Sequence, residues 1–547
     1  MKLTPGLRDK AFRWIADDVD PAARTELQQV LAQAMGGAPD AAAELADRMA
    51  GPLTFGTAGL RGPVRAGPNG MNRSVVIRAT AGVAAWLAHN GHTSGQVVVG
   101  RDARHGSAEF FADAVAVLTA AGYSVCQLDG PLPTPMTAFA VRHLGAIAGI
   151  QITASHNPPA DNGYKLYMAD GTQIVPPDDR LIEAAIRDVP AAVSVPLVRI
   201  PPETRDDVVE AYYARVSSLP RGTARDLKIA LTPMHGVGGQ PAVEALRRAG
   251  FTDVHVVMAQ AAPDPDFPTV TFPNPEEPGA SDLLLELAAS VDADLAIALD
   301  PDADRCALGV QVDGTWRMLR GDETGALLGS YVLSTVTAPD PLVATTIVSS
   351  ALLGSIAAKA GARYDETLTG FKWLVRAGDG AGTGLVFAYE EALGNCVDPD
   401  FVRDKDGISA AVVACDMAAG LQASGRTLAD VLAALAAEHG VHLTDQVSLR
   451  VTELPLIGRL MAGLRSSPPS SLAGISVAME DLLPKADVLR FKGEGLRVIV
   501  RPSGTEPKLK AYLEVVEPVP GDLADARAKA GERLSALRSE MAELLGA

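Results

Sequence analysis

The strand and helix patterns that decide the fold lie in residues 96–157, QVVVGRDARHGSAEFFADAVAVLTAAGYSVCQLDGPLPTPMTAFAVRHLGAIAGIQITASHN. Three apolar runs there end in polar residues, at 96–102, 123–130 and 146–157, and each predicts a strand. Between the first two, residues 107–122 have apolar side chains at helical spacing and a final glycine. This order of strand, helix and strand predicts βαβ units in a mostly parallel sheet.

The same rhythm restarts twice downstream. From about residue 205, helical patterns alternate with the strand-like runs LKIALTP (227–233), VHVVMA (254–259) and ADLAIALDPDADR (293–305). From about residue 320, they alternate with LVATTIVSS (342–350) and GLVFAYEEA (384–392). We therefore predict three α/β domains of similar plan.

The two ends of the chain differ from this pattern. The first fifty or so residues predict helices, and GPLTFGTAGLRGPVRAGPNGMN (51–72) predicts a loop with little regular structure. Residues 497–518 predict two strands around a polar turn, followed by an amphipathic helix. The expected fold class is α/β in four domains with mixed sheets: domains at 1–204, 205–317 and 318–440, and an α+β domain at 441–547.

Composition limits the function. The chain has 547 residues, too many for one core, with 47% hydrophobic and 21% charged residues, as expected of a globular protein. The formal net charge is −18 and no Lys/Arg run occurs, so we expect no nucleic-acid partner. An anionic substrate would need a locally basic pocket.

The N-terminus and the cysteines indicate the compartment. MKLTPGLRDKAFRWIADD lacks the apolar run of a signal peptide, and no stretch of about 18 apolar residues occurs anywhere. We expect a cytoplasmic protein without a membrane partner. No C-x-x-C pair is present, so we expect reduced thiols at Cys126, Cys306, Cys396 and Cys415.

TASHNPPADNGYKLY (153–167) follows a predicted strand, so Ser155 is expected in a loop at a strand end. A serine can carry a phosphoryl group, which adds a charge of roughly −1.5 to −2, where a metal and cations balance it. Lys165 reaches the same site if the loop folds back. The alternative is a rigid surface turn with an ordinary serine.

DPDADR (300–305) directly follows an apolar strand and carries three aspartates at alternate positions. Asp300, Asp302 and Asp304 would repel one another unless a cation joins them, and Mg²⁺ prefers oxygen ligands. Arg305 could then contact phosphate. An EF-hand is excluded because its glycine and glutamate positions are Arg305 and Gln311. A phosphatase with an aspartate nucleophile, or a solvated turn, stays possible at this point.

RPSGTEPKLK (501–510) lies between two strand-like runs and can form the basic pocket. Arg501 can bind phosphate with two parallel hydrogen bonds, and Ser503 and Thr505 add hydroxyl donors. Gly504 allows backbone N–H groups to approach an anion. The alternative is a hairpin turn with surface cations.

Three further segments are weaker signals. YEEALG (389–394) offers Glu390 and Glu391 to sugar hydroxyls, and TLTGFKW (367–373) offers Gly370 and Lys372 as a second sugar-facing loop. FGTAGLRG (55–62) places Arg61 in a glycine-rich loop, which is not a P-loop because its Lys-Ser/Thr ending is missing.

Taken together and in this order, FGTAGLRG, TASHNPP, DPDADR, YEEALG and RPSGTEPK resemble the α-D-phosphohexomutase superfamily. It includes phosphoglucomutases, phosphomannomutases, phosphoglucosamine mutases and related phosphopentomutases. The resemblance covers about residues 50–515 and implies four domains with one motif each around a central cleft.

The resemblance also implies a role for each site residue. Ser155 would be the phosphoserine, and Mg²⁺ would be held by Ser155, Asp300, Asp302 and Asp304. Glu390 would bind sugar hydroxyls, and Arg501, Ser503, Gly504 and Thr505 the phosphate that is not transferred. Arg305 would lie beside the phosphoserine. The cleft residues that assist acid–base chemistry or bind substrate would be Arg61, His156, Lys165 and Lys372.

The implied activity is interconversion of hexose 1-phosphate and hexose 6-phosphate, of mannose or glucose, through a sugar 1,6-bisphosphate that also serves as activator. The general base would be Lys165 or, as second choice, His156. Ala392 stands where many hexomutases have serine, so the sugar stays open and a phosphopentomutase or a sugar-bisphosphate synthase is the alternative. A catalytically dead binding protein is a further rival, and a monomer or homodimer is expected.

Overall fold

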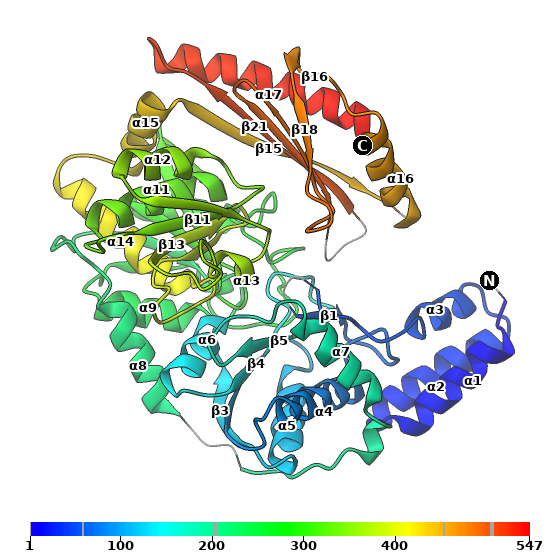
Figure 1. Ribbon diagram of the computed structural model, residues 1–547. Helices are drawn as coiled ribbons and strands as arrows, with labels where there is room; N and C mark the ends of the chain where they lie inside the picture. The colour runs from blue at the N-terminus through cyan, green and yellow to red at the C-terminus, as the bar shows by residue number, and fades with distance from the viewer. Residues whose placement is uncertain (1, 57–58, 202–204, 452–453, 504–507, 547) are drawn as a thin grey trace. The chain divides into compact units, whose positions relative to one another are not determined.

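The chain forms two compact units in this computed structural model, which describes residues 2–56, 59–201, 205–451, 454–503 and 508–546 (Figure 1). Unit 1 comprises Met1–Gly309 and Asp398–Asp416, and unit 2 comprises Val310–Val397 and Met417–Ala547. The segment from Asp398 therefore returns to the first unit after the chain has begun the second.

Unit 1 begins with three helices, α1 (Pro5–Asp17), α2 (Pro21–Met35) and α3 (Ala41–Arg48). The first two start at a proline, and the side chains of Thr4 and Asp20 accept hydrogen bonds from the first-turn N–H groups. The helices share a small apolar core that includes Leu27 and Leu45. The helical prediction for this end is confirmed.

The first sheet of unit 1 has the strand order β1 (Leu60–Pro63), β5 (Asp161–Met168), β4 (Ala148–Ile152), β2 (Gln96–Arg101), β3 (Ser124–Pro131). β2 pairs in parallel with β3 and β4, whereas β5 is antiparallel to β4 and β1. The prediction of a loop at 51–72 was therefore wrong in part, because Leu60 pairs with Tyr164 in a short strand.

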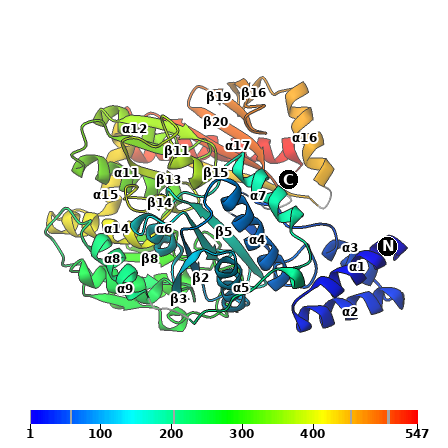
Figure 2. The ribbon, with the colours of Figure 1, turned by 60° about the horizontal axis from the view of Figure 1, so that its bottom comes forward.

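Helices cover both faces of this sheet. α4 (Arg73–His89), α5 (Ser107–Ala120) and α7 (Asp178–Asp188) pack over the face that buries Val99 and Ile150 (Figure 2). α6 (Thr134–His143) lies on the other face, where a Cβ at Gly149 would stand 2.4 Å from Val141. The start of α6 lies beside the strand ends that carry the site, because the Thr134 N–H donates to the Asp302 carbonyl at 3.0 Å.

The second sheet has the strand order β10 (Thr315–Met318), β9 (Cys306–Val312), β8 (Leu295–Leu299), β6 (Ile229–Thr232), β7 (Val254–Val256). Its helices are α8 (Asp206–Ser217), α9 (Gly239–Arg248) and α10 (Asp282–Val291). The predicted strand at 254–259 ends early, and a 3₁₀ turn follows at Met258–Gln260. β9 runs antiparallel to β8, so residues 300–305 form a tight reversal between two buried strands.

Unit 2 contains the third sheet, in the order β12 (Arg363–Thr367), β11 (Leu342–Thr346), β13 (Leu385–Glu390), β14 (Gly394–Cys396). Its helices are α11 (Gly321–Thr335), α12 (Leu352–Ala360), the short α13 (Phe371–Leu374) and α15 (Leu428–His439). The long helix α14 (Gly407–Ala423) leads back into this unit from the return segment.

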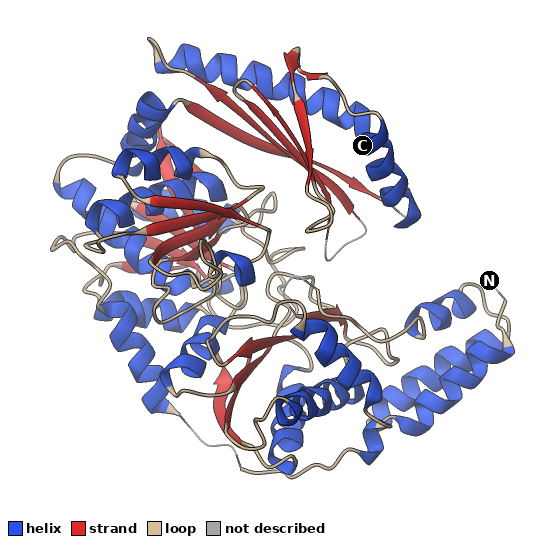
Figure 3. Ribbon diagram, viewed as in Figure 1, coloured by secondary structure: helices blue, strands red, loops and turns tan. Residues whose placement is uncertain are grey.

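The fourth sheet is antiparallel, in the order β15 (Val441–Arg450), β21 (Lys508–Glu517), β20 (Leu496–Pro502), β19 (Leu489–Gly493), β18 (Ala478–Asp481). α16 (Leu454–Ser466) and α17 (Leu523–Leu545) pack on it, beside a small hairpin of β16 (Ser471–Leu472) and β17 (Ile475–Ser476) (Figure 3). The predicted α+β plan and the two strands around a polar turn are confirmed.

No single described helix has both the length and the apolar character needed to cross a membrane, whereas α14 and α15, bent by 90°, pass that test only as a pair.

Candidate active site

Ser155 lies on the loop that follows β4 in unit 1. Its backbone has φ 53°, a left-handed conformation that is uncommon for residues other than glycine. The Ser155 N–H donates to Thr153 Oγ1 at 2.9 Å, and the residue is only 1% exposed. Such strain persists only where the surrounding structure fixes it, and it concentrates at functional sites.

The Ser155 hydroxyl faces two polar groups. It donates to Asp300 Oδ2 at 2.9 Å, and His156 Nδ1 lies 3.1 Å from Ser155 Oγ. The antiparallel pairing of β8 and β9 turns the chain back after Asp300, and this brings the second motif onto the first. The predicted meeting of the two loops is therefore observed.

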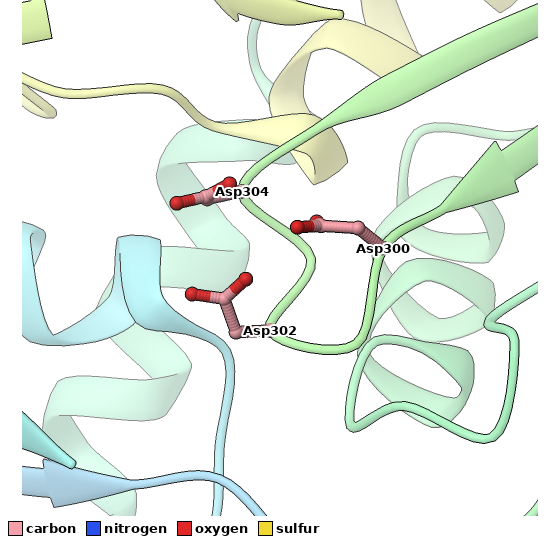
Figure 4. A group of neighbouring side chains, drawn as sticks. All are labelled: Asp300, Asp302 and Asp304. Atoms are coloured by element: carbon pink, nitrogen blue, oxygen red, sulfur yellow. The ribbon is translucent and has the colours of Figure 1, made fainter. Parts of the chain in front are cut away.

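The three aspartates converge on one small space (Figure 4). One carboxylate oxygen from each of Asp300, Asp302 and Asp304 lies within 4.8 Å of the other two, and all three residues are fully buried. Ala303 has φ 54°, and its N–H donates to the Asp300 carbonyl at 2.8 Å, which closes the turn. The alternation seen in the sequence thus becomes a cluster because the chain reverses within five residues.

Burial and mutual repulsion set the charge of this cluster. Burial, followed by the neighbouring carboxylates of Asp302 and Asp304, raises the pKa of Asp300 well above its ordinary value. Burial also acts to raise the pKa of Asp302 and Asp304, but the lowering contacts together outweigh it: Lys165 and Thr134 at Asp302, and Lys165, Lys405 and Arg305 at Asp304 hold the pKa of each below the ordinary value. The cations beside the cluster therefore favour the ionised forms of Asp302 and Asp304, whereas Asp300 is held towards its protonated form.

Lys165 is one of those cations. Its Nζ donates to Asp302 Oδ2 at 2.8 Å and to Asp304 Oδ2 at 2.7 Å, and the residue, which lies on β5, is fully buried. Burial lowers its pKa, but the two carboxylates more than offset this, so the pKa of Lys165 is raised overall. Lys165 reaches the site through strand pairing, Gln151 with Lys165, where we had expected a folded loop.

His156, Arg61 and Arg305 surround the same loop. Burial, with Arg305 and Arg61 close by, holds the pKa of His156 well below its ordinary value, so its imidazole is neutral. Arg61 Nη1 donates to Asn157 Oδ1 at 3.1 Å, and Arg305 Nε lies 3.9 Å from Asp304 Oδ1. All five predicted catalytic residues of unit 1 therefore lie together.

Sequence reasoning missed three residues of this site. Thr134 Oγ1 donates to Asp302 Oδ2 at 2.5 Å from the start of α6, and Lys405 Nζ lies 3.2 Å from Asp304 Oδ2. Arg104 binds the backbone of the Ser155 loop. Arg104 follows the end of β2, so the strand-end rule could have found it; the others lack such a signal.

The cluster suits a divalent cation that prefers oxygen. Asp302 Oδ1 and Asp304 Oδ1 are buried and accept no hydrogen bond from the described residues. Buried acceptors without a partner are costly and need an explanation. Three close carboxylates with two unused oxygens fit Mg²⁺, whose ligands are oxygens in a compact shell.

The predicted sugar-binding glutamates lie in unit 2 and differ from each other. Glu390 ends β13, is 8% exposed and accepts no hydrogen bond from the described residues. Glu391 Oε2 instead accepts hydrogen bonds from Thr346 at 3.1 Å and from Ser349 at 3.0 Å. Burial, followed by the nearby Glu390, raises the pKa of Glu391 to about 7. Glu390 is thus the better placed acceptor for a ligand.

The other predicted contacts of unit 2 lie on two loops. Gly370, with φ 114°, starts the short helix α13 that carries Lys372. Arg501 is near the end of β20, and its guanidinium pairs with none of the described residues. The Ser503 N–H donates to the Lys508 carbonyl at 2.8 Å, whereas Gly504 and Thr505 lie outside the described residues. A common cleft for these loops and Ser155 stays a prediction.

Comparison with known families matches the chain along most of its length. Four domain models described as phosphoglucomutase/phosphomannomutase match in order: the α/β/α domains I, II and III at residues 52–192, 208–313 and 320–439, and the C-terminal domain at 451–520. The four-domain α/β plan is therefore confirmed, and our own boundaries stay a prediction.

Individual relatives agree with this match. The chain is 43% identical to a Haemophilus influenzae protein named "Probable phosphomannomutase" over 81% of this chain and 93% of that protein. It is 33% identical to the Mus musculus phosphopentomutase over 99% of this chain and 94% of that one. A solved phosphoglucomutase/phosphomannomutase family protein from Burkholderia thailandensis has the same fold, with TM-score 0.70 and 21% identity over 90% of this chain and 97% of that one. The chain belongs to the phosphoglucomutase/phosphomannomutase family.

Proposed function

We propose that this enzyme interconverts hexose 1-phosphate and hexose 6-phosphate, of mannose, glucose or both, through a phosphoryl group carried on Ser155. The observation that carries the proposal is the buried, strained Ser155, whose Oγ lies against Asp300 and His156. A hydroxyl held in this way beside a cation site suits the transfer of a phosphoryl group.

In the proposed cycle, a hydroxyl of the sugar monophosphate attacks the phosphorus of phosphorylated Ser155. The new O–P bond forms as the bond from phosphorus to Ser155 Oγ breaks, and a sugar 1,6-bisphosphate results. The bisphosphate turns over, and its other phosphoryl group returns to Ser155 Oγ. The same bisphosphate would act as activator by phosphorylating Ser155.

Asp300, Asp302 and Asp304, together with the phosphate on Ser155, would hold Mg²⁺, which when bound supplies positive charge to the transferring phosphoryl group. Arg305, whose Nε lies 4.0 Å from Asp300 Oδ2, adds a second cation at the same place. The protein's own contribution is to position charges that need no rearrangement during the reaction.

The proton of the attacking hydroxyl needs a base. The sequence favours Lys165 as the base, but the Lys165 ammonium already donates to two carboxylates and its pKa is raised. His156 has a lowered pKa and therefore a free lone pair at neutral pH. The lowered pKa therefore supports His156 as the base, whereas Lys165 would first have to give up two ion pairs.

The substrate phosphate that is not transferred would bind at Arg501, Ser503, Gly504 and Thr505, and Glu390 would accept hydrogen bonds from sugar hydroxyls. Gly370 and Lys372 would form a second wall for the sugar. A bisphosphate that turns over needs space, so we expect the C-terminal domain to hinge. We also place the enzyme in the cytoplasm, as a monomer or homodimer acting on free phosphosugars.

A phosphopentomutase or a sugar-bisphosphate synthase is the second candidate. The similarity to the mouse phosphopentomutase over nearly the whole chain favours the former, as does Ala392 in place of a serine. The reaction type is the same, so only the sugar distinguishes it.

The test is a substrate panel with Mg²⁺ and catalytic bisphosphate. It contains the α-1-phosphates of glucose, mannose and glucosamine together with ribose 1-phosphate. Rapid isomerisation of glucose or mannose phosphate would support the proposal, and a preference for ribose would move the enzyme to the alternative. Release of inorganic phosphate without isomerisation would overturn both and favour a phosphatase, and no turnover of any kind would favour a binding protein.

A further inference from the structure

Arg104, which follows β2, is buried against the backbone of the Ser155 loop. Its side chain is 1% exposed, and its guanidinium carbon lies 5.0 Å from the centre of the Phe267 ring. None of the candidate site motifs in the sequence includes Arg104.

Among the residues that the structure describes, the guanidinium donates hydrogen bonds only to backbone carbonyls of residues 155–161. Nη2 donates to the Ser155 carbonyl at 2.7 Å and to the Asn157 carbonyl at 2.5 Å. Nη1 donates to the Pro158 carbonyl at 2.8 Å and to the Asp161 carbonyl at 3.0 Å. Four carbonyls spread over seven residues therefore converge on one planar cation.

This convergence explains how the loop keeps an unfavourable backbone. A left-handed conformation is costly at a residue such as Ser155 and needs support from its surroundings. Guanidinium offers five donors in a rigid fork, which a flexible ammonium cannot reproduce. The carbonyl of Ser155 itself is one of the four groups held.

Asp102 holds Arg104 in turn. Asp102 Oδ1 accepts hydrogen bonds from the Arg104 N–H at 2.9 Å and from Ser107 Oγ at 2.6 Å. Asp102 Oδ2 lies 3.6 Å from Arg104 Nε. The buried Asp102 carboxylate therefore holds both the backbone and the guanidinium of Arg104 in place, directly after strand β2.

We infer that Arg104 is a positioning residue for the phosphoryl-transfer step. Its hydrogen bonds fix the backbone of the Ser155 loop and thereby set the direction in which Ser155 Oγ points. The inference rests on the proposed role of Ser155. Arg104 touches backbone carbonyls and not the reacting atoms, so its loss should slow transfer while leaving sugar binding nearly unchanged. A displacement of about 1 Å at the reacting group can reduce the rate about 100-fold.

Arg225 provides a matched control in the same unit. Its guanidinium also donates to two backbone carbonyls, of Ala249 at 2.7 Å and of Ala224 at 2.6 Å. It also lies 5.1 Å from a phenylalanine ring, that of Phe251. Arg225→Lys should therefore disturb packing in a similar way without touching the Ser155 loop.

The experiment compares wild type, Arg104→Lys, Asp102→Asn and Arg225→Lys. Each full-length protein is treated with phosphatase, the phosphatase is removed, and glucose 1,6-bisphosphate with Mg²⁺ is added. The rate of phosphate gain on Ser155 is followed by intact mass and peptide mapping. Steady-state kcat and KM on the best hexose 1-phosphate, and the thermal midpoint, are measured in parallel.

We expect Arg104→Lys to lower the phosphorylation rate and kcat about 10- to 100-fold, with KM changed less than about threefold. Asp102→Asn should lower both rates less, and Arg225→Lys should leave both near wild type. Wild-type rates in both Arg104→Lys and Asp102→Asn would overturn the inference, as would equal losses in Arg225→Lys. Asp102→Asn decides alone if Arg104→Lys does not fold. A wild-type protein that gains no phosphate on Ser155 would instead overturn the proposed function, and the inference with it.

Discussion

Ser155 Oγ donates a hydrogen bond to Asp300 Oδ2 at 2.9 Å across 145 residues of sequence. This bond joins the end of a strand in the first sheet to the end of a strand in the second. Both residues are fully or nearly fully buried, so their pairing defines where the transferred group would stand.

Ser155→Ala should abolish mutase activity, with a loss on the order of 1,000-fold or more, because no other group takes over as phosphoryl carrier. The variant should also fail to gain mass when incubated with glucose 1,6-bisphosphate. Circular dichroism should show an unchanged fold, and Ser424→Ala, at an exposed serine, is the control. Substantial activity in Ser155→Ala would refute the assignment.

Asp304→Asn should raise the Mg²⁺ concentration needed for half-maximal activity by at least about 10-fold. The substitution removes one negative charge and one of the two carboxylate oxygens that lack a hydrogen-bond partner among the described residues. Activity is titrated with Mg²⁺ after treatment with a chelator. Wild type should lose activity on chelation and regain it with Mg²⁺.

The control for this titration is Asp313→Asn, at an exposed turn residue with φ 49°. Asparagine tolerates this conformation as aspartate does, and the Mg²⁺ requirement should not change. An unchanged requirement in Asp304→Asn would mean that the aspartate cluster is not the metal site.

Much of this site can be predicted from the sequence, because its motifs directly follow apolar runs that predict strands. TASHN and DPDADR each follow an apolar run, and open α/β sheets place ligands at such ends. The motif order then predicts that the runs share one site. The sequence alone was therefore enough to predict that Ser155 and Asp300 lie in the same site.

Other contacts depend on packing that no local pattern encodes. Lys165 was expected from a loop, and it arrives on β5 because that strand pairs antiparallel to β4. Thr134 contacts the aspartates because α6 docks beside them, and Lys405 contacts them because the chain returns to unit 1 at Asp398. The two glutamates of YEEALG look alike in sequence, but only the structure separates the hydrogen-bonded Glu391 from Glu390.

Glu391→Gln should remove a pH dependence of stability. The pKa of Glu391 is about 7 in the folded protein, against an ordinary value of 4.5. The folded state therefore binds this proton more tightly than the unfolded state, so stability is highest below about pH 4.5 and falls as pH rises to about 7. Glutamine cannot ionise and should not show this loss.

The measurement is the difference in thermal midpoint between wild type and Glu391→Gln from pH 5 to pH 8. Wild type should lose stability relative to the variant as pH rises, since its buried carboxyl must then ionise. The difference cancels the titration of the other groups. A difference that does not vary with pH would mean that the Glu391 carboxyl is not perturbed.

Arg501→Ala should raise KM for the hexose phosphate about 10- to 100-fold, with a smaller effect on kcat. The guanidinium has no partner among the described residues, so the substitution breaks no structural ion pair there. Arg501→Lys should recover part of the affinity, because lysine keeps the charge but not the paired geometry.

Arg465→Ala is the control for Arg501→Ala. Arg465 contacts Asp481 at 2.9 Å and Asp487 at 2.5 Å in the same unit, so its loss removes ion pairs without touching the 501–510 loop. Equal KM changes in the two variants would argue against phosphate binding at Arg501.

Arg497→Met should destabilise unit 2 strongly. Arg497 Nη2 lies 2.7 Å from Glu514 Oε2, and Arg497 Nη1 lies 3.0 Å from Glu366 Oε1, joining the third and fourth sheets. Although burial opposes it, Arg497 helps to lower the pKa of Glu514 to about 2. Removing the cation leaves the buried Glu514 carboxylate with its contacts to Ser350 and His442 but without the guanidinium, and breaking such a buried pair costs up to about 3–5 kcal/mol.

Hydrogen exchange of the amides in β20 and β21 measures this loss within unit 2 itself, whereas global unfolding would mix both units. Arg533→Met, which breaks the more exposed pair with Glu517, should cost less than about 1 kcal/mol. Arg497→Met combined with Glu514→Gln should recover part of the stability, because no unpaired charge then stays buried. If the single and double variants exchange equally fast, the lost stability comes from packing of the Arg497 stem and not from the stranded charge of Glu514.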